Sequence, residues 1–421
     1  MTGTASDGLA AESTPVLELD PIASVVDAVG RGEFVVVLDD ADRENECDLI
    51  CAASAMTDDA MRFLLRHTSG VVCVSADGAR IDALELPPMV SDNTEAHQTA
   101  FTVSVDYRHG TTTGISPTDR AATVRALADP AVNAVEFRRP GHIFPLRARD
   151  GGVLKRAGHT EAGVDLARLA GLAPVAALCE LVDESGDMMR APEAVRFART
   201  HGLRVTSVAE LIRWRRQTER LVEVDGTAPI PTKYGTFTVH SYRSLLDGME
   251  HVALVLGEIG EGEDVLVRVH SECLTGDIFG SLRCDCGDQL EMALAQIAEV
   301  GRGVVVYLRG HEGRGVGLSH KLRAYVLQDK GFDTVDANLE LGLPVDSRDY
   351  GVGAQILADL GVQSVVLLTN NPGKYGGLAG HGIRITDRLP LHSTPTLHNS
   401  AYLATKRDRL GHLLGIEAAG S

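Results

Sequence analysis

Strand-like and helix-like segments alternate through the C-terminal half of the chain, and this alternation restricts the fold more than any other feature of the sequence. Short valine-rich runs predict buried strands at residues 265–269, 304–308 and 365–368. Amphipathic segments predict helices at residues 290–300, 318–330 and 355–360. Repeated alternation of this kind indicates an α/β sheet, in which ligands bind beyond the carboxyl ends of the strands.

The N-terminal half is predicted to form an α+β domain. The apolar residues from Ile22 to Val29 predict a helix, and Phe34–Leu38 and Val71–Val74 predict strands. The region from Thr111 to Leu146 is rich in Thr, Gly and Pro, and it predicts a long loop. A loop of that length inside a compact domain is a candidate functional site.

A short segment rich in Pro and Gly marks the predicted boundary between two domains. Residues 206–221 predict a helix that starts with a Ser207–Glu210 capping box, and Asp225–Pro231 follows it. We therefore expect a disordered tail at residues 1–17, a first domain at 18–217, a linker at 218–226 and a second domain at 227–421.

The chain is acidic, with a formal net charge of −18 at pH 7 over 421 residues. This charge and an aromatic content of 4% argue against partners such as nucleic acid or anionic membranes. The sequence has no apolar run of the roughly 18 residues that a membrane span needs, and residues 1–15 lack the pattern of a signal peptide. The cysteine count of seven, an odd number, predicts a reducing, cytoplasmic location.

Three of the cysteines follow the first predicted strand of the C-terminal half with the spacing C-x10-C-x-C. Cys273, Cys284 and Cys286 offer zinc three soft thiolate ligands and leave a fourth position open for catalysis. A closed structural zinc site with a distant fourth ligand, or three unrelated core cysteines, would show the same spacing. All three interpretations stay open on the spacing alone.

Polar residues gather at the ends of the same predicted strands. Arg268–Glu272 precedes the first cysteine, and Asp346–Arg348 and Thr369–Lys374 follow later elements. The turn His311–Gly315 contains two glycines and an arginine, a composition that suits a polyphosphate but also a plain glycine turn.

These segments resemble GTP cyclohydrolase II. The resemblance rests on residues 268–277, 283–287, 311–315, 333–338 and 368–372, and it spans about residues 226–415. It implies hydrolysis of GTP to a phosphoribosylated diaminopyrimidine, formate and pyrophosphate. It also implies Zn²⁺ held by the three cysteines, and Mg²⁺ bound with GTP.

The same resemblance implies roles for individual residues. The positions that match GTP-contacting residues are Arg268, Val269, His270, Ser271, Glu272, Gln289, Glu312, Gly313, Arg314, Thr334, Thr369 and Lys374. Asp346 matches a proton acceptor, Tyr325 a position implicated in the chemistry, and Arg348 a nucleophile toward the α-phosphorus. Because a guanidinium group is almost always protonated, we interpret Arg348 as a clamp for transition-state charge.

An acidic loop follows the first predicted strand of the N-terminal half. Asp39–Asp48 holds six carboxylates in ten residues, a density that destabilises the loop unless a cation is present. The loop lacks the glycine of a calcium-binding EF-hand loop. His142 and His159 lie in glycine-flanked segments of the same half. Together these residues indicate an oxygen-rich metal site, and a solvated acidic turn is the alternative.

This half resembles 3,4-dihydroxy-2-butanone 4-phosphate synthase. The resemblance rests on the acidic loop and on residues 68–73, 101–103, 112–116, 119–120, 139–147 and 179–181, and it spans about residues 18–217. It implies conversion of D-ribulose 5-phosphate to 3,4-dihydroxy-2-butanone 4-phosphate plus formate through an enediol. Both halves in this order resemble the bifunctional riboflavin-biosynthesis family, and a homodimer is implied by the resemblance only.

The synthase resemblance also implies site residues. The positions that match substrate-contacting residues are Arg43, Glu44, Asp48, Arg156, Ala157, Gly158, His159, Thr160 and Glu180. Glu44 and His159 match the ligands of Mg²⁺ or Mn²⁺. His142 and Glu180 match residues essential for proton transfer, and Cys73 matches an active-site position. A buried apolar cysteine is the alternative for Cys73.

Two residues depart from the synthase pattern. Cys47 and Gln98 stand where glycine is usual, and a side chain there is disfavoured wherever the backbone needs a positive φ. We expect an active cyclohydrolase, and we weigh an enzyme with two activities against one whose N-terminal half is a dimerisation or regulatory scaffold. A zinc-stabilised binding protein without turnover is the third hypothesis.

Overall fold

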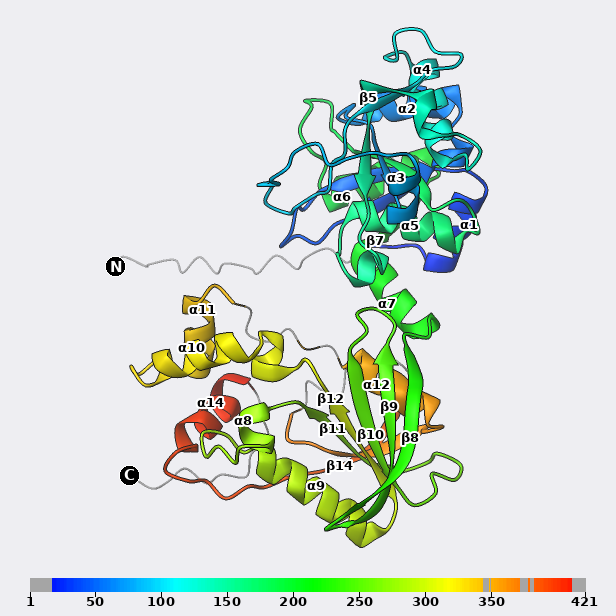
Figure 1. Cartoon of the computed structure of the whole chain (residues 1–421). Helices are drawn as coiled ribbons and strands as arrows, with labels where there is room; N and C mark the ends of the chain where they lie inside the picture. The colour runs from blue at the N-terminus through cyan, green and yellow to red at the C-terminus, as the bar shows by residue number, and fades with distance from the viewer. Residues whose placement is uncertain (1–16, 344–347, 349, 372–377, 379–381, 411–421) are drawn as a thin grey trace, which may run out of the picture. The chain divides into compact units, whose positions relative to one another are not determined.

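The computed structural model describes residues 17–343, 348, 350–371, 378 and 382–410 (Figure 1). The chain divides into two compact units, residues 1–215 and 216–421, and each has its own seven-stranded sheet. The predicted tail at residues 1–17 falls almost wholly outside the described residues. Among the residues that are described, no helix is both long enough and apolar enough to cross a membrane.

The sheet of the first unit has the strand order β4-β5-β3-β6-β2-β1-β7. The pairs β1–β7 and β3–β5 are parallel, and the other neighbours are antiparallel. The strands are β1 (Val35–Leu38), β2 (Cys47–Ala52), β3 (Cys73–Ala76), β4 (Val105–Tyr107), β5 (Phe137–Arg147), β6 (Val175–Glu180) and β7 (Arg204–Ser207). The helices are α1 (Ile22–Gly30), α2 (Asp58–His67), α3 (Gly78–Ala83), α4 (Pro117–Ala128), α5 (His159–Leu169), α6 (Ala191–His201) and α7 (Val208–Thr218), with short 3₁₀ turns at η1 (Ala53–Ala55), η2 (Ala134–Glu136) and η3 (Gly152–Leu154).

Helices cover both faces of this sheet, which explains why its central strands are apolar throughout. Val36 and Leu49 pack on one face with residues of α2, α3, α4 and α6. Val35 and Ile50 pack on the other face with residues of α1, α5 and α7. A strand buried on both faces loses the alternation of polar and apolar residues, as β1 does. The mixed sheet confirms the α+β expectation.

The region from Thr111 to Leu146 is not a long loop, so this sequence prediction is wrong. Ser116 accepts a hydrogen bond from the Asp119 N–H at 3.1 Å and Pro117 occupies the first turn, so α4 starts there. Residues 137–147 form β5, whose register against β4 shifts between Val105 and Asp106. This bulge holds the segment 139–142, and it explains why a strand contains Pro and Gly.

The sheet of the second unit has the strand order β14-β13-β11-β12-β10-β9-β8. Strands β12, β11, β13 and β14 run parallel, and β8, β9, β10 and β12 pair antiparallel. The strands are β8 (Val222–Thr232), β9 (Gly235–Ser244), β10 (Glu250–Leu256), β11 (Val265–Ser271), β12 (Gly303–Leu308), β13 (Ser364–Leu368) and β14 (Arg384–Leu389). The helices are α8 (Leu274–Asp277), α9 (Cys286–Val300), α10 (Leu318–Gln328), α11 (Thr334–Glu340), α12 (Gly351–Asp359) and α14 (Ser400–Leu410), with a 3₁₀ turn at η4 (Glu312–Gly315).

Two helices sandwich the parallel part of this sheet. Ile356 of α12 packs with Val267 on one face, and Ile297 of α9 packs with Leu266 on the other. Figure 1 shows α10, α11 and α14 as a group beside α8, and contacts join α10 to α11 and α11 to α14. The predicted strands at 304–308 and 365–368 and the helix at 318–330 are confirmed as β12, β13 and α10, and the α/β expectation is confirmed with them.

Several boundaries differ from the sequence prediction, among them the helix predicted at 206–221, which is α7 at Val208–Thr218. Helix α9 begins at Cys286 rather than 290, and α12 begins at Gly351 rather than 355. The segment 225–231 lies inside β8. Among the described strands, β8 lies at the edge of the sheet and pairs only with β9, and an edge strand tolerates prolines. Its register against β9 shifts between Val224 and Gly226.

Candidate functional sites

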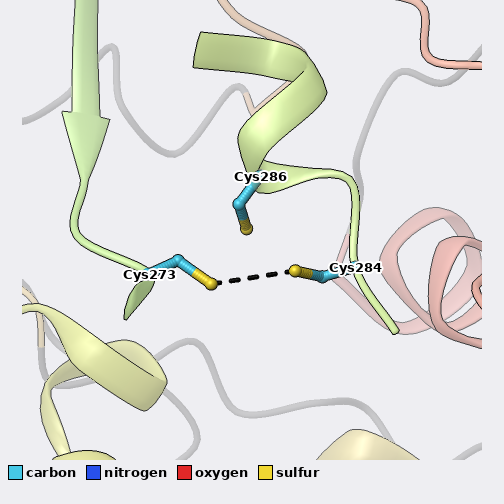
Figure 2. Close-up of side chains that lie close together, drawn as sticks. All are labelled: Cys273, Cys284 and Cys286. Atoms are coloured by element: carbon cyan, nitrogen blue, oxygen red, sulfur yellow. Dashed lines mark hydrogen bonds between the residues drawn. The ribbon is translucent and has the colours of Figure 1, made fainter. Parts of the chain in front are cut away.

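Three cysteines meet beyond the carboxyl end of β11 (Figure 2). Cys273 follows the strand, Cys284 lies in the turn after α8, and Cys286 begins α9. Their sulfur atoms all lie within 4.8 Å of one another, and the Sγ atoms of Cys273 and Cys284 are 3.7 Å apart. Tetrahedral zinc with Zn–S bonds of about 2.3 Å would hold two sulfurs about 3.8 Å apart. The donor set therefore fits zinc.

The thiols of the cluster differ in pKa. Hydrogen bonds from Cys284 and Cys286, and then the charge of Lys321, lower the pKa of the Cys273 thiol far below its usual value. The hydrogen bond with Cys273 raises the pKa of Cys284 to about 11. One thiolate therefore forms readily without a metal, whereas a bound cation would stabilise all three.

A short turn fixes the position of Cys273. The buried Asp277 carboxylate accepts hydrogen bonds from the Cys273 N–H at 2.9 Å, from His270 Nε2 at 3.1 Å and from the Tyr307 hydroxyl at 2.8 Å. A Cβ at position 276 would lie 2.8 Å from Cys284 Sγ, so only glycine lets the turn approach the other cysteines. Asp277 and Gly276 therefore assemble the cluster.

The thiol cluster opens into a cavity of about 300 Å³. Besides the cysteines, the predicted residues on its walls are Arg268, His270, Ser271, Glu272, Gln289, Glu312, Gly313, Arg314, Tyr325, Thr334, Arg348 and Thr369. Val269 instead packs in the core of the sheet, because neighbouring residues of a strand point to opposite faces. Asp346 and Lys374 lie outside the described residues.

A buried polar chain reaches this cavity from the C-terminal helix. Arg268 donates to Gln289 Oε1 at 2.7 Å, and Gln289 donates to Asp285 Oδ2 at 2.6 Å. Lys406 of α14 donates to Asp285 Oδ1 at 2.7 Å and, with Tyr402, lines the cavity. Sequence analysis missed Lys406 and Tyr402, since no local spacing relates α14 to the cysteines, and it gave no role to Asp285, which lies between Cys284 and Cys286.

Both carboxylate oxygens of Glu312 accept hydrogen bonds from other residues of the protein. Its Oε1 accepts a hydrogen bond from Lys321 at 2.5 Å, and its Oε2 accepts one from the Leu274 N–H at 2.6 Å. Glu312 thus supports the turn after Cys273 in this structure. Lys321 is a further residue that sequence analysis missed, because its helix carries no motif that separates it from surface lysines.

In the first unit, the acidic loop and the start of α5 form a second polar cluster. His159 Nδ1 lies 3.4 Å from Asp48 Oδ1, and His159 Nε2 lies 3.1 Å from the Val37 carbonyl oxygen. Burial lowers the pKa of His159, so the imidazole is neutral and able to bind a metal. Burial, and then the charge of Glu180, raises the pKa of Asp48 well above its usual value.

The donors of this cluster suit a hard cation. Arg43 bridges Asp39 Oδ2 at 2.8 Å and Glu44 Oε2 at 2.7 Å, and the Glu44 N–H donates to Asp39 at 3.0 Å. The Oδ1 atoms of Asp39 and Asp48 are buried, and no group of the described residues donates a hydrogen bond to them. Buried carboxylate oxygens without donors are favourable only beside a cation, and Mg²⁺ prefers oxygen ligands. Among the described residues, however, only Cys273, Cys284 and Cys286 bring three potential ligand atoms within 4.8 Å of one another, so a metal held by Glu44 and neutral His159 stays a prediction.

Two arginines converge over the first residues of α5. A Cβ at Gly158 would lie 2.6 Å from Arg156 Nη1 and 3.0 Å from Arg43 Nη2, so both guanidinium groups approach the backbone there. Ala157 is exposed beside them, and Thr160 is buried in the first turn of α5. Arginines at a helix N-terminus suit a phosphate group.

The remaining predicted residues of this half are Glu180, Cys73 and His142, and they have different partners. Glu180 pairs with Asp48 in the register of β6 and β2 and accepts a hydrogen bond from Ser69 at 2.6 Å. Cys73 is buried, and burial followed by the charge of Glu180 raises the pKa of its thiol well above its usual value. His142 Nδ1 instead bonds Asp106 at 2.8 Å, and among the described residues no hydrogen bond or ion pair links His142 to the cluster.

The two departures from the synthase pattern have different backbones. Cys47 begins β2, the residue is 2% exposed, and it is not among the described residues with positive φ. The expectation of strain at Cys47 is therefore wrong, because Asn45 takes the left-handed conformation in this loop, at φ 54°. Gln98 has φ 53°, so the expectation of strain holds there.

Comparisons with known proteins cover both units. The family model for 3,4-dihydroxy-2-butanone 4-phosphate synthase matches residues 23–214, and the model for GTP cyclohydrolase II matches residues 223–390. The bifunctional riboflavin biosynthesis protein RIBA 1, chloroplastic, of Arabidopsis thaliana is 57% identical over 408 residues, which are 96% of this chain and 75% of that protein. The riboflavin biosynthesis protein RibBA of Rhodococcus jostii (strain RHA1) is 57% identical over 405 residues, which are 94% of this chain and 97% of that protein.

A solved structure supports the same two-domain arrangement of folds. The crystal structure of RibBX, a two domain 3,4-dihydroxy-2-butanone 4-phosphate synthase from A. baumannii, aligns with a TM-score of 0.66 and 34% identity. The alignment covers 87% of this chain and 99% of that one. The chain therefore belongs to the family of bifunctional riboflavin biosynthesis proteins, in which a 3,4-dihydroxy-2-butanone 4-phosphate synthase domain precedes a GTP cyclohydrolase II domain.

Proposed function

We propose that the chain catalyses two reactions of riboflavin biosynthesis. The C-terminal domain hydrolyses GTP to a phosphoribosylated diaminopyrimidine, formate and pyrophosphate. The N-terminal domain converts D-ribulose 5-phosphate to 3,4-dihydroxy-2-butanone 4-phosphate plus formate. The observation that carries the proposal is the thiol cluster at the wall of a cavity that also holds Arg268, Gln289 and Arg314. The scaffold alternative has no support, because relatives with bifunctional names align with both domains.

In the C-terminal domain, Cys273, Cys284 and Cys286 would hold Zn²⁺. When bound, zinc supplies a Lewis acid that lowers the pKa of a water. Arg314 and Arg348, both on the cavity wall, supply positive charge for the triphosphate, which would enter with Mg²⁺. Arg268 and Gln289 lie bonded to each other beside the cysteines and present polar groups to the base.

In the N-terminal domain, Glu44 and His159 would hold Mg²⁺ or Mn²⁺ against the hydroxyl groups of the sugar. Arg43 and Arg156 bind the phosphate, and a cavity of about 680 Å³ lies beside both arginines. Glu180 and His142 transfer protons. Because Asp106 accepts the hydrogen bond from His142 Nδ1, the Nε2 atom is left to exchange a proton with substrate.

One preparation assayed for both reactions tests the proposal. Formate should form from GTP with Zn²⁺ and Mg²⁺ present, and from D-ribulose 5-phosphate with Mg²⁺. A preparation that hydrolyses GTP but never releases formate from the pentulose phosphate would return the N-terminal half to a scaffold role. A preparation that leaves GTP intact would contradict the cyclohydrolase assignment.

The assembly and location follow from family likeness. We propose a homodimer, and light scattering after size exclusion should give twice the 44.8 kDa of the chain. A mass of one chain at micromolar concentration would contradict this. The cytoplasmic location stays a prediction.

A further inference from the structure

A buried ammonium group contacts the thiol cluster. Lys321 lies on α10, and its side chain is 10% exposed. Its Nζ donates to Cys273 Sγ at 3.1 Å, to Thr275 Oγ1 at 2.8 Å and to Glu312 Oε1 at 2.5 Å. An ammonium has three N–H donors, and each has an acceptor here, so the position of the charge is fixed.

The contact with sulfur is more than a by-product of the ion pair with Glu312. Here the second oxygen of Glu312 accepts the Leu274 N–H at 2.6 Å, directly after Cys273 in the chain. Lys321, Glu312 and the Cys273 turn therefore form one closed network that aims the ammonium at the sulfur.

The charge of the ligand set gives this contact a chemical consequence. Three thiolates outweigh the double positive charge of zinc, and a net negative cluster acidifies a water less than a neutral or positive one does. A hydrogen bond from an ammonium withdraws electron density from the sulfur that accepts it. Groups that bond to ligands in this way tune the metal without touching it.

We propose that Lys321 is a positioning residue of the cyclohydrolase: by its hydrogen bond to Cys273 it withdraws charge from the sulfur and preserves the Lewis acidity of the metal. The inference rests on the proposed function of the C-terminal domain. It adds a residue that acts through Cys273 rather than through contact with GTP.

The test uses the full-length chain with Co²⁺ in place of Zn²⁺, because sulfur-to-cobalt charge-transfer bands report electron density on the thiolates. In Lys321→Gln, the band should move to lower energy. With zinc, kcat for GTP should fall about 10–100-fold, while KM changes less than about threefold. Lys321→Arg, which keeps a donor and the charge, should restore much of both. Lys330→Gln, an exposed lysine just after α10, is the matched control and should leave both unchanged.

Formate release from D-ribulose 5-phosphate measures the concentration of the chain in the same sample, and thermal unfolding of each variant measures its folding. If Lys321→Gln does not fold, Lys321→Met keeps the length of the side chain and replaces it. A neutral variant with the wild-type band and the wild-type kcat overturns the inference. So does a fall in kcat with an unmoved band that Lys321→Arg fails to rescue, since that pattern marks a purely structural contact. Wild-type protein that takes up no metal at the cluster, or leaves GTP intact, would instead refute the proposed function.

Discussion

The two candidate metal sites differ in how completely the polypeptide prepares them. In the C-terminal domain three sulfurs already lie within 4.8 Å of one another. In the N-terminal domain Glu44 is paired with Arg43 at 2.7 Å, and His159 contacts the Val37 carbonyl oxygen at 3.1 Å. The cysteine ligands are thus brought together by the fold, whereas a metal at the proposed Glu44–His159 site would have to displace existing partners. This difference suits a tightly held Zn²⁺ and a more exchangeable Mg²⁺.

Substitution of one ligand at each site should separate the two activities most completely. Cys284→Ser should lower GTP hydrolysis by at least about 10³-fold, because loss of the metal removes several kcal/mol of transition-state stabilisation. Formate release from D-ribulose 5-phosphate should stay at the wild-type level. Glu44→Gln should give the reverse pattern. A variant that loses both activities would show that the two sites depend on each other, and would contradict their treatment as separate sites.

Metal removal should affect both sites but unequally in time. Brief treatment with EDTA should stop the synthase reaction at once, whereas zinc should leave the thiol cluster over a much longer period. Added Mg²⁺ should then restore the synthase, and the cyclohydrolase should need Zn²⁺ as well once its zinc is gone. Metal analysis of samples taken over time checks this. Loss of zinc as fast as magnesium would contradict the idea of a preassembled soft site.

The buried pair between Lys406 and Asp285 tests how far the C-terminal site depends on α14. Lys406→Ala leaves the Asp285 carboxylate buried without its cation, which should cost about 3 kcal/mol of stability and lower kcat/KM for GTP about tenfold. Lys233→Ala is the control, because Lys233 is 66% exposed and solvent screens its pair with Glu291. Denaturant unfolding and GTP kinetics measure both effects. Equal losses in the two variants would exclude a special role for α14.

The smallest effects are expected at the two unusual positions of the synthase domain. Cys47→Gly should destabilise the protein by about 1–2 kcal/mol and leave the synthase rate unimproved, because the residue is 2% exposed in a strand. Gln98→Gly should stabilise it by about 0.5 kcal/mol, since glycine removes the strain at φ 53° but loses more chain entropy. Thermal unfolding and formate assays compare them. A faster synthase in Cys47→Gly would revive the argument that glycine is needed there.

Local patterns predicted the parts of the sites that lie close together in the chain. The cysteines sit on one turn and the start of one helix, so their spacing made a cluster one of three possible interpretations, and the structure brings the sulfurs together. The buried strands β1, β12 and β13 follow from runs of apolar residues. The error at 111–146 came from composition, because Ser116 and Pro117 start a helix although Thr, Gly and Pro surround them.

Contacts between distant elements could not be predicted in this way. Lys406 meets Asp285 across 121 residues of sequence, and Lys321 meets Cys273 across 48. Nothing in the helical pattern of α10 or α14 distinguishes a buried lysine from a solvated one, since a lysine is buried only when a carboxylate or thiolate pairs with it in the folded protein. Such residues become visible only once the sheet has placed the helices.

The short turn held by Asp277 affects what happens to the C-terminal domain when zinc is scarce. Gly276 and the hydrogen bonds of Asp277 hold the turn of Cys273 through contacts within the protein, so this ligand has support that does not come from a metal. Unlike a zinc finger, the domain should survive starvation for zinc as an intact, dormant form. Such a pool could regain activity within the time that an ion needs to arrive, without new protein synthesis.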